Sequence, residues 1–281
     1  MFFAFLAAFL IGVADGCSKY AISKLKTGRL MLISSVIQIF LNFLFFRILN
    51  GQFPGLNIIL KLSLVQILSA IAYLFYVIAL YYGNVSIITA IISSSSIFTV
   101  LLGTFILKEK IGYLQYFGIF LIILGSFGIS YEKNKISKDE KKFLWLLLTI
   151  ISTVLWGIWA FLIKVVVSDV KPFELSFFNS TFSFIFLLPY ILFSIRKEKN
   201  VSLSFLPLLS SILFALFVFG GLISFYFSTS KISVSLSFPI FCSSPLITAI
   251  FSSIFFKEKL QKHQYFSLFL IIFSLFLINL S

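Results

Sequence analysis

The sequence predicts an all-α polytopic membrane protein with ten transmembrane helices, arranged as two inverted five-helix repeats. Composition is the first reason, because 60% of the 281 residues are hydrophobic and only 11% are charged, too few to cover a soluble domain of this size. The second reason is the 46-residue run 62–107, which holds no charged residue and no histidine. A membrane helix needs about 20 apolar residues, so this run must cross a bilayer twice. The runs are continuous rather than alternating, which excludes a β-barrel.

The third reason is a segment that occurs twice. Residues 108–123 return as residues 257–272, at an offset of 149, and ten of the sixteen positions are identical. A repeat at about half the chain length indicates two copies of one unit. We therefore divide the chain into a first five-helix repeat at 1–131, a charged linker at 132–142 and a second five-helix repeat at 143–281. Units with an odd number of helices have opposite orientations in the membrane, so the repeat is of the inverted kind.

The predicted helices end at charged or turn-rich segments. The linker is the most polar stretch of the chain, with five lysines and three acids in 11 residues, and residues 82–84 offer the one plausible break in the long apolar run. The ten expected helices are 2–22, 30–49, 62–81, 85–107, 112–131, 143–167, 172–195, 203–228, 232–256 and 264–280.

The two halves match at other positions too. Gly12 and Lys19 correspond to Gly157 and Lys164 at an offset of 145. At the offset of 149, a second set of small polar residues corresponds in the same way, with Ser94, Ser95 and Thr99 matching Ser243, Ser244 and Thr248. These matches pair the helices of one half with those of the other in chain order.

The basic excess indicates contact with lipid. The net charge of +13 comes mostly from short loops, where lysines orient helices and meet anionic headgroups. We therefore expect a lipid bilayer, in a bacterial inner (cytoplasmic) membrane, and no nucleic acid. The loops that follow helices one, three, five, seven and nine carry more than twice as many basic residues as the other connections. The positive-inside rule then places both termini outside.

The sequence lacks the motifs that several classes of protein function require. The sequence has no phosphate-binding glycine loop, so direct ATP drive is not expected, and it has no cluster of metal ligands. It also has no membrane-embedded Ser/His pair or carboxylate pair for hydrolysis. We therefore expect no enzyme, with no catalytic residue, metal or cofactor. Cys17 and Cys242 lie in apolar segments, where no disulfide framework is expected.

Three ionisable residues lie within predicted helices, where such groups are candidates for function. Asp15 is the one acid among nine that is not in a loop or at a helix end. Lys19 follows one turn later on the same face, so the two can pair, and Lys164 is its counterpart in the second half. Asp15 either neutralises Lys19 or takes up protons. The two lysines either extend to the membrane surface or contact cargo.

Uncharged groups in the helices could line a pathway. Each of them singly is better explained by packing or by helix-to-helix hydrogen bonds, but together they indicate an aromatic cavity with a few hydrogen-bonding groups. Pro239 and Pro245 free backbone carbonyls, which membranes tolerate beside protein or a water-filled cavity. The candidate translocation residues are Asp15, Lys19, Gln38, Asn42, Tyr73, Tyr76, Ser94, Ser95, Trp156, Trp159, Lys164, Asn179, Ser224, Tyr226, Ser243, Ser244 and Pro245.

Two motifs are interpreted as structural. Gly12 and Gly16 are four residues apart, a spacing that lets membrane helices approach closely. In the Lys-Glu-Lys motifs at 108–110 and 257–259, each glutamate precedes a helix, and a helix N-terminus favours negative charge. The lysines of the motifs suit lipid phosphates.

These features resemble EamA-type transporters of the drug/metabolite transporter superfamily. The resemblance rests on the five-plus-five layout, on the glycine-to-lysine spacing in the first helix of each half (with Trp156 before the second glycine) and on a charged loop before each half's last helix. It covers nearly the whole chain, so both halves are expected to be EamA-like repeats. The family loop usually reads Gly-Glu-Arg rather than Lys-Glu-Lys, Ile11 stands where tryptophan is common, and Asp15 is not a usual feature. The resemblance implies a central cavity, alternating access and cytoplasmic termini, opposite to the charge count.

The sequence therefore favours a secondary transporter, an exporter of a small metabolite such as an amino acid or related compound. Protons are a candidate coupling ion, and monomer and homodimer are both open. The alternatives are an importer of a scavenged metabolite (S-adenosylmethionine or a nucleotide sugar) and a flippase of lipid-linked headgroups. We place the site in the asymmetries between the halves, with Asp15 on one side and Trp156 and Trp159 on the other.

Overall fold

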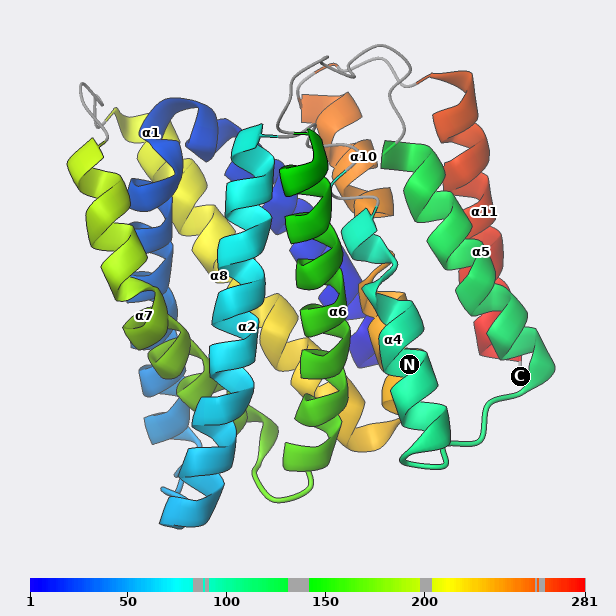
Figure 1. Cartoon of the computed structure of the whole chain (residues 1–281), viewed down its shortest axis with the longest axis horizontal. Helices are drawn as coiled ribbons and strands as arrows, with labels where there is room; N and C mark the ends of the chain where they lie inside the picture. Colours follow the sequence, from blue (N-terminus) through cyan, green and yellow to red (C-terminus); the bar gives the residue numbers. More distant parts are fainter. Residues whose placement is uncertain are drawn as a thin grey trace.

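The chain forms a bundle of α-helices, seen here in a computed structural model. The structure describes residues 1–82, 88, 91–130, 142–197, 204–255, 257 and 261–280. Every element within those residues is an α-helix (Figure 1), and the order is α1 (Phe2–Ile48), α2 (Leu56–Tyr82), α4 (Ser95–Phe105), α5 (Tyr113–Ser130), α6 (Lys142–Val166), α7 (Pro172–Lys197), α8 (Phe205–Lys231), α9 (Val234–Phe241), α10 (Ser244–Phe255) and α11 (Lys262–Leu280).

Helices α5, α6, α7, α8 and α11 lie within three residues of their predicted ends, and the larger differences have local causes. Helix α2 begins at Leu56, not at residue 62, because the carbonyl of Gly55 accepts the N–H of Ile58 (2.9 Å) and starts the helix ahead of Lys61. The break expected between residues 22 and 30 is present, but it is much shorter than the expected basic loop. Helix α1 contains two helical segments that join at Lys26, whose φ of 64° and ψ of 172° are its only non-helical pair, and the chain reverses there (Figure 1).

The described helices are apolar enough for a membrane. Six are long enough to cross one, namely Tyr20–Ile48, Leu56–Ala79, Leu144–Val166, Pro172–Lys197, Phe205–Lys231 and Val234–Phe255. Four further apolar helices are shorter, namely Phe2–Ser18, Ile91–Phe105, Tyr113–Ile129 and Lys262–Ile278. The membrane character is thus evident, while the count of ten crossings and the inverted symmetry stay predictions. The predicted linker lies outside the described residues except for Lys142.

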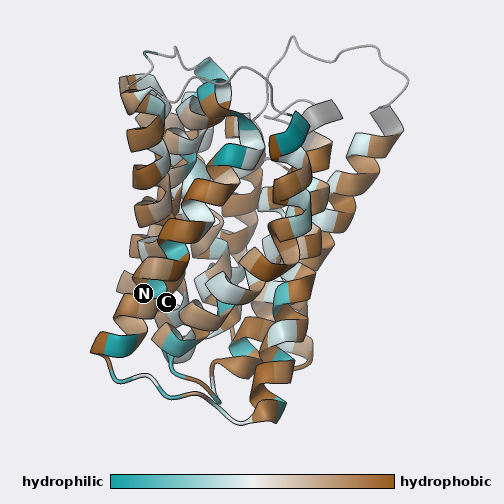
Figure 2. Ribbon diagram, turned by 90° about the vertical axis from the view of Figure 1, so that its left-hand side faces the viewer, coloured by the Kyte–Doolittle hydropathy of each residue, from teal (hydrophilic) through white to brown (hydrophobic). Residues whose placement is uncertain are grey.

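The helices run between two ends of the bundle. In Figure 1 the upper end holds the reversal of α1 and the ends of α2 and α5. The lower end holds the connections α4–α5, α6–α7 and α8–α9, and both termini lie toward it. Hydrophobic residues dominate the helices in Figure 2, and hydrophilic residues gather in the connections of the lower end.

Two matching helix crossings hold the halves together. In one crossing, Thr99 Oγ1 of α4 donates a hydrogen bond to the carbonyl of Gly157 in α6 (2.8 Å). In the other, Thr248 Oγ1 of α10 donates to the carbonyl of Gly12 in α1 (3.1 Å). The threonines are 149 residues apart and the glycines 145 apart, so each half gives the other the same contact.

Glycine is required at both crossings because the backbones touch. A Cβ at Gly157 would lie 2.6 Å from the carbonyl oxygen of Ser95, and a Cβ at Gly12 would lie 2.7 Å from that of Ser244. Both distances are far inside ordinary contact, and a backbone oxygen cannot rotate away as a side-chain end can. The prediction of close packing at Gly12 is confirmed.

The largest apolar cluster fills the lower half of the bundle. It joins α2, α6, α7, α8 and α9 through buried residues that include Leu62, Val65, Trp159, Ile163, Phe178, Phe225, Tyr226 and Phe238. Helices α5 and α11 form a separate pair at the edge (Figure 1), where Gly118 and Gly125 sit on the carbonyls of Ser274 and Ser267. No candidate translocation residue lies on that pair.

The crossing makes a testable prediction. Replacing Gly157 by alanine should separate α6 from α4 and lower the free energy of unfolding by about 1–3 kcal/mol, the usual effect of overpacking. Thermal unfolding of the purified protein in detergent measures this. Gly220→Ala is the matched control, because a Cβ there meets only the flexible Cδ1 end of Leu10, at 3.1 Å. A Gly157→Ala protein as stable as wild type would contradict the crossing.

Candidate functional site

Two helices are interrupted at matching positions. The first break is at Ser94, just before α4, and the second is at Cys242 and Ser243, between α9 and α10. Prolines at 239 and 245 explain the second, since proline lacks an N–H for the helix ladder. The helix predicted over 232–256 is present as the span Val234–Phe255, and this break divides it into α9 and α10. The breaks meet at the centre, where Ser95 Oγ lies 3.9 Å from Cys242 Sγ.

The serines at the breaks bond within their own helices. Ser94 Oγ donates to the carbonyl of Ile91 (2.5 Å), and Ser243 Oγ donates to that of Ile240 (2.6 Å). The expectation of helix-to-helix bonds is wrong for Ser94 and Ser243, because a serine hydroxyl readily bonds a carbonyl in its preceding turn, whereas Ser95 does contact another helix at Cys242. The threonines of the crossings make those bonds instead. Ser244 is buried against Gly12, and Pro245, next to it, is partly exposed.

Asp15 faces two tyrosines across the bundle. Its side chain has accessible surface although Ala14 and Gly16 on either side are buried, and it lies deep in the bundle with protein atoms around it. It lies within electrostatic reach of Tyr73 and Tyr76 on α2. Helix α2 packs mainly on α6 and α7, whereas the start of α1 packs on α8 and α10. Asp15 and the tyrosines thus approach from helices that are held by different partners.

An aromatic row continues from the tyrosines to α6. The ring centroids of Tyr73 and Tyr76 are 6.3 Å apart, and those of Tyr76 and Trp156 are 5.4 Å apart. All three side chains are partly exposed. The structure therefore brings together four of the predicted site residues, Asp15, Tyr73, Tyr76 and Trp156.

A second set of candidates is buried in the lower apolar cluster. Trp159 stacks on Phe225 with centroids 5.9 Å apart, and Tyr226 and Ser224 are buried beside it on α8. Trp159 Nε1 and the Tyr226 hydroxyl have no hydrogen-bond partner among the described residues. Buried polar atoms are rarely left so. These groups lie closer to the lower end than Asp15 and are closed off from solvent.

The amides lie on the outer helices. Asn42 Nδ2 donates to the carbonyl of Gln38 on α1 (2.8 Å), and Gln66 Oε1 on α2 accepts from Ser183 on α7 (3.4 Å). Asn179 is buried on α7. The oxygens of Asn42 and Asn179 find no partner in the described part of the chain. No contact in the described residues joins these amides to Asp15.

Lys164 binds the backbone at the C-terminal end of α8. Its Nζ donates to the carbonyls of Thr229 (2.5 Å) and Ile232 (2.8 Å), where α8 ends. A cation is favoured at a helix C-terminus. This contact differs from the expected extension to the membrane surface, and contact with cargo stays a prediction. The side chain of Lys19, its counterpart, lies outside the described residues.

Glu109 fastens the second half to the first. It follows Lys108, which has φ 54°. Its carboxylate accepts the backbone N–H groups of Val234 (2.9 Å) and Ser235 (3.0 Å) and the Ser235 hydroxyl. These are the first N–H groups of α9 and have no partner inside the helix. The expected role at the start of α5 is wrong, since Glu109 caps a helix of the other half.

Glutamines, and not the glutamates as expected, accept the backbone N–H groups at the starts of α5 and α11. The N–H of Gly112 donates to Gln115 Oε1 (3.0 Å) before α5, and the N–H of Gln261 donates to Gln264 Oε1 (2.8 Å) before α11. The two pairs are 149 residues apart. The start of α5 is thus satisfied locally, which frees Glu109 for α9. Glu258 lies outside the described residues.

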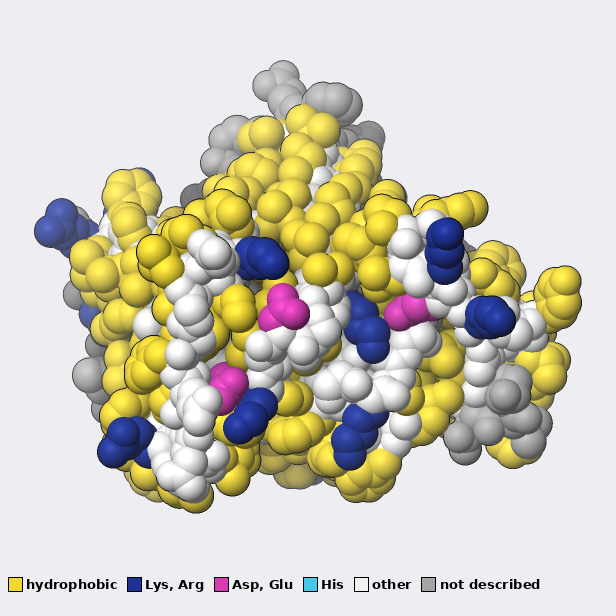
Figure 3. Space-filling view, turned by 90° about the horizontal axis from the view of Figure 1, so that it is seen from below, with side chains coloured by type: hydrophobic (Ala, Val, Ile, Leu, Met, Phe, Trp, Pro, Cys, Tyr) yellow, Lys and Arg dark blue, Asp and Glu magenta, His cyan; other side chains and the backbone are white. Residues whose placement is uncertain are grey.

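We call Lys164, Glu109 and the chain 229–235 between them the lower clasp. One cation holds the end of α8 and one anion holds the start of α9, so the connection is fixed on both sides. Figure 3 shows this lower end of the bundle, where acidic side chains lie among basic and hydrophobic ones.

The family model of EamA-like transporters matches residues 1–131 and 143–280, so the match covers both halves. The chain belongs to the EamA-like transporter family. A solved structure described only as "Crystal structure of protein" has a TM-score of 0.83 at 13% identity, covering 99% of this chain and 96% of that one, which shows the same fold. No curated protein matches the sequence. The EamA-like chain is therefore an integral membrane protein, and family and fold point to a transporter of small molecules rather than an enzyme.

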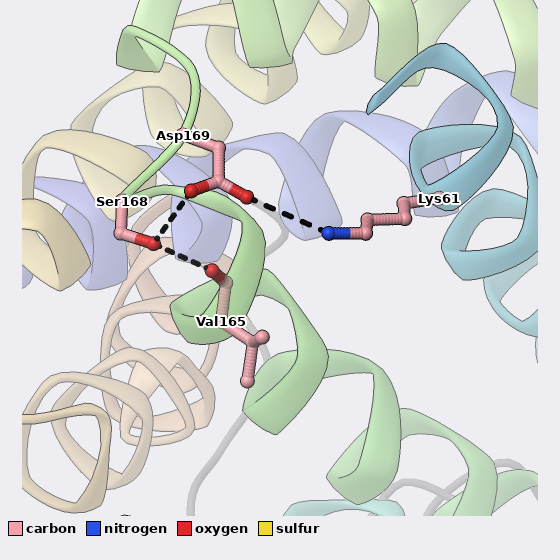
Figure 4. Close-up of polar contacts among 4 residues, drawn as sticks. All are labelled: Lys61, Val165, Ser168 and Asp169. Atoms are coloured by element: carbon pink, nitrogen blue, oxygen red, sulfur yellow. Dashed lines mark hydrogen bonds and ion pairs between the residues drawn. The ribbon is translucent and has the colours of Figure 1, made fainter. Parts of the chain in front are cut away.

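A groove on the EamA-like fold lies apart from the candidate residues. It has a volume of about 520 Å³ and lies between the α1–α2 connection and the turn after α6, with none of the candidates in its lining. Glu174 closes it by accepting the N–H groups of Gln52 (2.9 Å) and Lys171 (3.1 Å). Lys61 and Asp169 form an exposed ion pair of 3.9 Å at its rim (Figure 4), and exposed pairs of this kind contribute about 0–1 kcal/mol.

Sequence reasoning missed the clasp in this EamA-like chain, although a signal for it exists. Residues 84–86 read Asn-Val-Ser and residues 233–235 read Ser-Val-Ser, again 149 apart. Asn and Ser are preferred at helix N-termini. The recurrence of that signature together with the repeated glutamate could have suggested a glutamate that caps a distant helix.

The clasp predicts a change in accessibility. Glu109→Ala removes three hydrogen bonds to a carboxylate, each worth about 1.5–3 kcal/mol, and should loosen α9 at the lower end. Ser237 is fully buried and donates to Ser228 Oγ. A cysteine at 237, in a chain with Cys17 and Cys242 replaced by alanine, should react with a membrane-impermeant maleimide on the order of tenfold faster in the Glu109→Ala background.

Glu174→Ala is the matched control for this measurement. It also removes a carboxylate that accepts two backbone N–H groups at the same end, but those groups belong to the α1–α2 connection and to the turn before α7. Labelling at 237 should stay at the wild-type rate. Equal acceleration by both variants would show general loosening and not a clasp.

The unpartnered hydroxyl of Tyr226 gives a second prediction. Removing a buried group that lacks a partner relieves its desolvation, so Tyr226→Phe should leave the melting temperature equal to or above wild type, by an equivalent of about 1 kcal/mol. Ser237→Ala should lower it, because that change strands Ser228 Oγ. Thermal unfolding in detergent compares the two. A clear loss of stability in Tyr226→Phe would mean that the hydroxyl has a partner.

Proposed function

We propose that this EamA-like protein is a secondary transporter that exports a small metabolite, such as an amino acid or a related compound, across a bacterial cytoplasmic membrane. The observation that carries the proposal is the placement of Asp15. An exposed carboxylate faces a row of partly exposed aromatic rings inside a bundle of apolar helices. Ionisable groups at such a depth are retained for transport pathways.

The proposed mechanism is alternating access between two inverted five-helix repeats with ten crossings in all. The reciprocal crossings at Gly12 and Gly157 support this arrangement, because equivalent residues of the two halves make equivalent contacts. The contrast between the ends of the bundle supports it as well. The lower half is filled by buried side chains and held by the clasp, while Asp15 and its aromatic neighbours are accessible above it. Opening the lower end would then require the clasp to release and the buried Trp159 and Tyr226 to become accessible.

Transport itself is tested in proteoliposomes. Purified full-length protein would be reconstituted and assayed for counterflow with a panel of labelled compounds that includes amino acids, S-adenosylmethionine and a nucleotide sugar. Saturable uptake that protein-free liposomes lack would support the proposal. Uptake of the scavenged compounds alone would favour an importer. Scrambling of a labelled lipid-linked headgroup without any uptake of soluble compounds would replace the proposal by a flippase.

Proton coupling makes a separate prediction. If Asp15 carries the coupling proton, transport should respond to an imposed pH gradient in the wild type and lose that response in Asp15→Asn, because an amide cannot exchange a proton. The measurement is initial uptake rate with and without the gradient. An Asp15→Asn protein with unchanged rate and unchanged gradient dependence would exclude Asp15 from coupling.

A further inference from the structure

We propose that the cargo of this site carries one positively charged group, an ammonium or a sulfonium, bound between the Asp15 carboxylate and the rings of Tyr73, Tyr76 and Trp156. The inference rests on the proposed transport function and names the chemical class of its cargo. It is argued from the charges and the rings at the site.

The three rings are of the kinds that attract a cation. Tyr73, Tyr76 and Trp156 lie in a row with centroid spacings of 6.3 and 5.4 Å, and each is partly exposed. A cation within about 6 Å of an aromatic centroid is attracted by the ring quadrupole, most strongly by tryptophan. None of these rings is covered by a lysine or arginine in the described part of the chain, whereas Phe3, Phe173 and Phe193 are. The row is therefore available to a cationic ligand.

The carboxylate supplies the charge. The Asp15 side chain has accessible surface but lies deep in the bundle, within electrostatic reach of two of the three rings. Within the described residues no lysine or arginine pairs with it, since the one ion pair there joins Lys61 and Asp169. Lys164 is held by two backbone carbonyls. An anion away from bulk water favours a cation as its ligand and repels a second anion.

The site suits a cargo with one positive charge, because Asp15 has no acidic counterpart in the second half. The offset of 145 that relates Gly12 to Gly157 relates Asp15 to Ala160, which is fully buried in the lower cluster. A compound with one cationic end fits this asymmetry. A nucleotide sugar, with its phosphate charges, would bring negative charge to Asp15 and is disfavoured.

The test uses full-length protein in nanodiscs and probes that differ only in charge. Choline is compared with 3,3-dimethylbutan-1-ol, and (2-hydroxyethyl)dimethylsulfonium with 3-methylbutan-1-ol. Each alcohol has carbon in place of the charged atom. Tryptophan fluorescence reports binding, because Trp156 belongs to the site. We expect at least one cation to bind at least tenfold more tightly than its carbon isostere.

The variants separate the site from general charge effects. Asp15→Asn should weaken binding of that cation at least tenfold, and Asp169→Asn, which removes an exposed carboxylate of the α6–α7 turn, should not. The proposal is overturned if no cation binds more tightly than its isostere, or if Asp15→Asn keeps the preference. The first of these outcomes is also the one expected if Lys19 neutralises Asp15.

Counterflow in proteoliposomes separates this inference from the proposed function. Transport of a neutral or anionic compound at the wild-type rate by Asp15→Asn would keep the transporter and overturn the cationic cargo. Binding of cations through Asp15 in nanodiscs, with no counterflow of any compound, would keep the cation site and overturn transport.

Discussion

The structure depends on two places where a helix of one half crosses a helix of the other at a glycine. Lipid is as apolar as leucine, so helices in a membrane associate through close packing and not through a hydrophobic gain. At Gly12 and Gly157 the absence of a side chain lets the backbones touch, and a threonine hydroxyl bonds each glycine carbonyl. The residues pressed against these glycines are Ser95 and Ser244, the first residues of α4 and α10. The crossings therefore hold the broken helices at their breaks.

The same crossings position the candidate site. Asp15 lies one turn beyond Gly12, and Trp156 directly precedes Gly157, so each glycine brings a functional candidate to the middle of the bundle. The carboxylate and the indole come from opposite halves, and Tyr76 of α2 contacts the indole. Movement of one half against the other would change the separation of Asp15 and Trp156, which is how a packed scaffold can couple cargo binding to a change of shape.

Helices and contacts that depend on neighbouring residues could be predicted from the sequence, whereas contacts between residues far apart in the chain could not. Hydropathy located most helices, because a bilayer demands long apolar runs, and the glycine spacing correctly indicated a close contact. The partner of Gly12 is Thr248, which is 236 residues away, and no local pattern identifies it. The prediction for Glu109 was wrong for the same reason. Its sequence neighbours suggested α5, but glutamine already satisfies that helix and the glutamate reaches α9, 125 residues on. The candidate site could be predicted only in part. The structure places Asp15 near three of the predicted aromatic residues, whereas Ser94, Ser243 and Lys164 bond helix backbones.

The symmetric and asymmetric parts of the molecule differ in kind. What the halves share are features of the backbone, namely the glycine crossings, the threonine bonds, the glutamine caps and the helix breaks. What they do not share are side chains at the centre. Asp15 corresponds to the buried Ala160, and Trp156 corresponds to Ile11, which packs on Gly221 of α8. Such a fold can keep one mechanism of movement while its central side chains change, because these side chains take no part in the crossings. We therefore propose that cargo preference in this chain depends on Asp15 and the aromatic row, and not on the repeated motifs that reveal the symmetry.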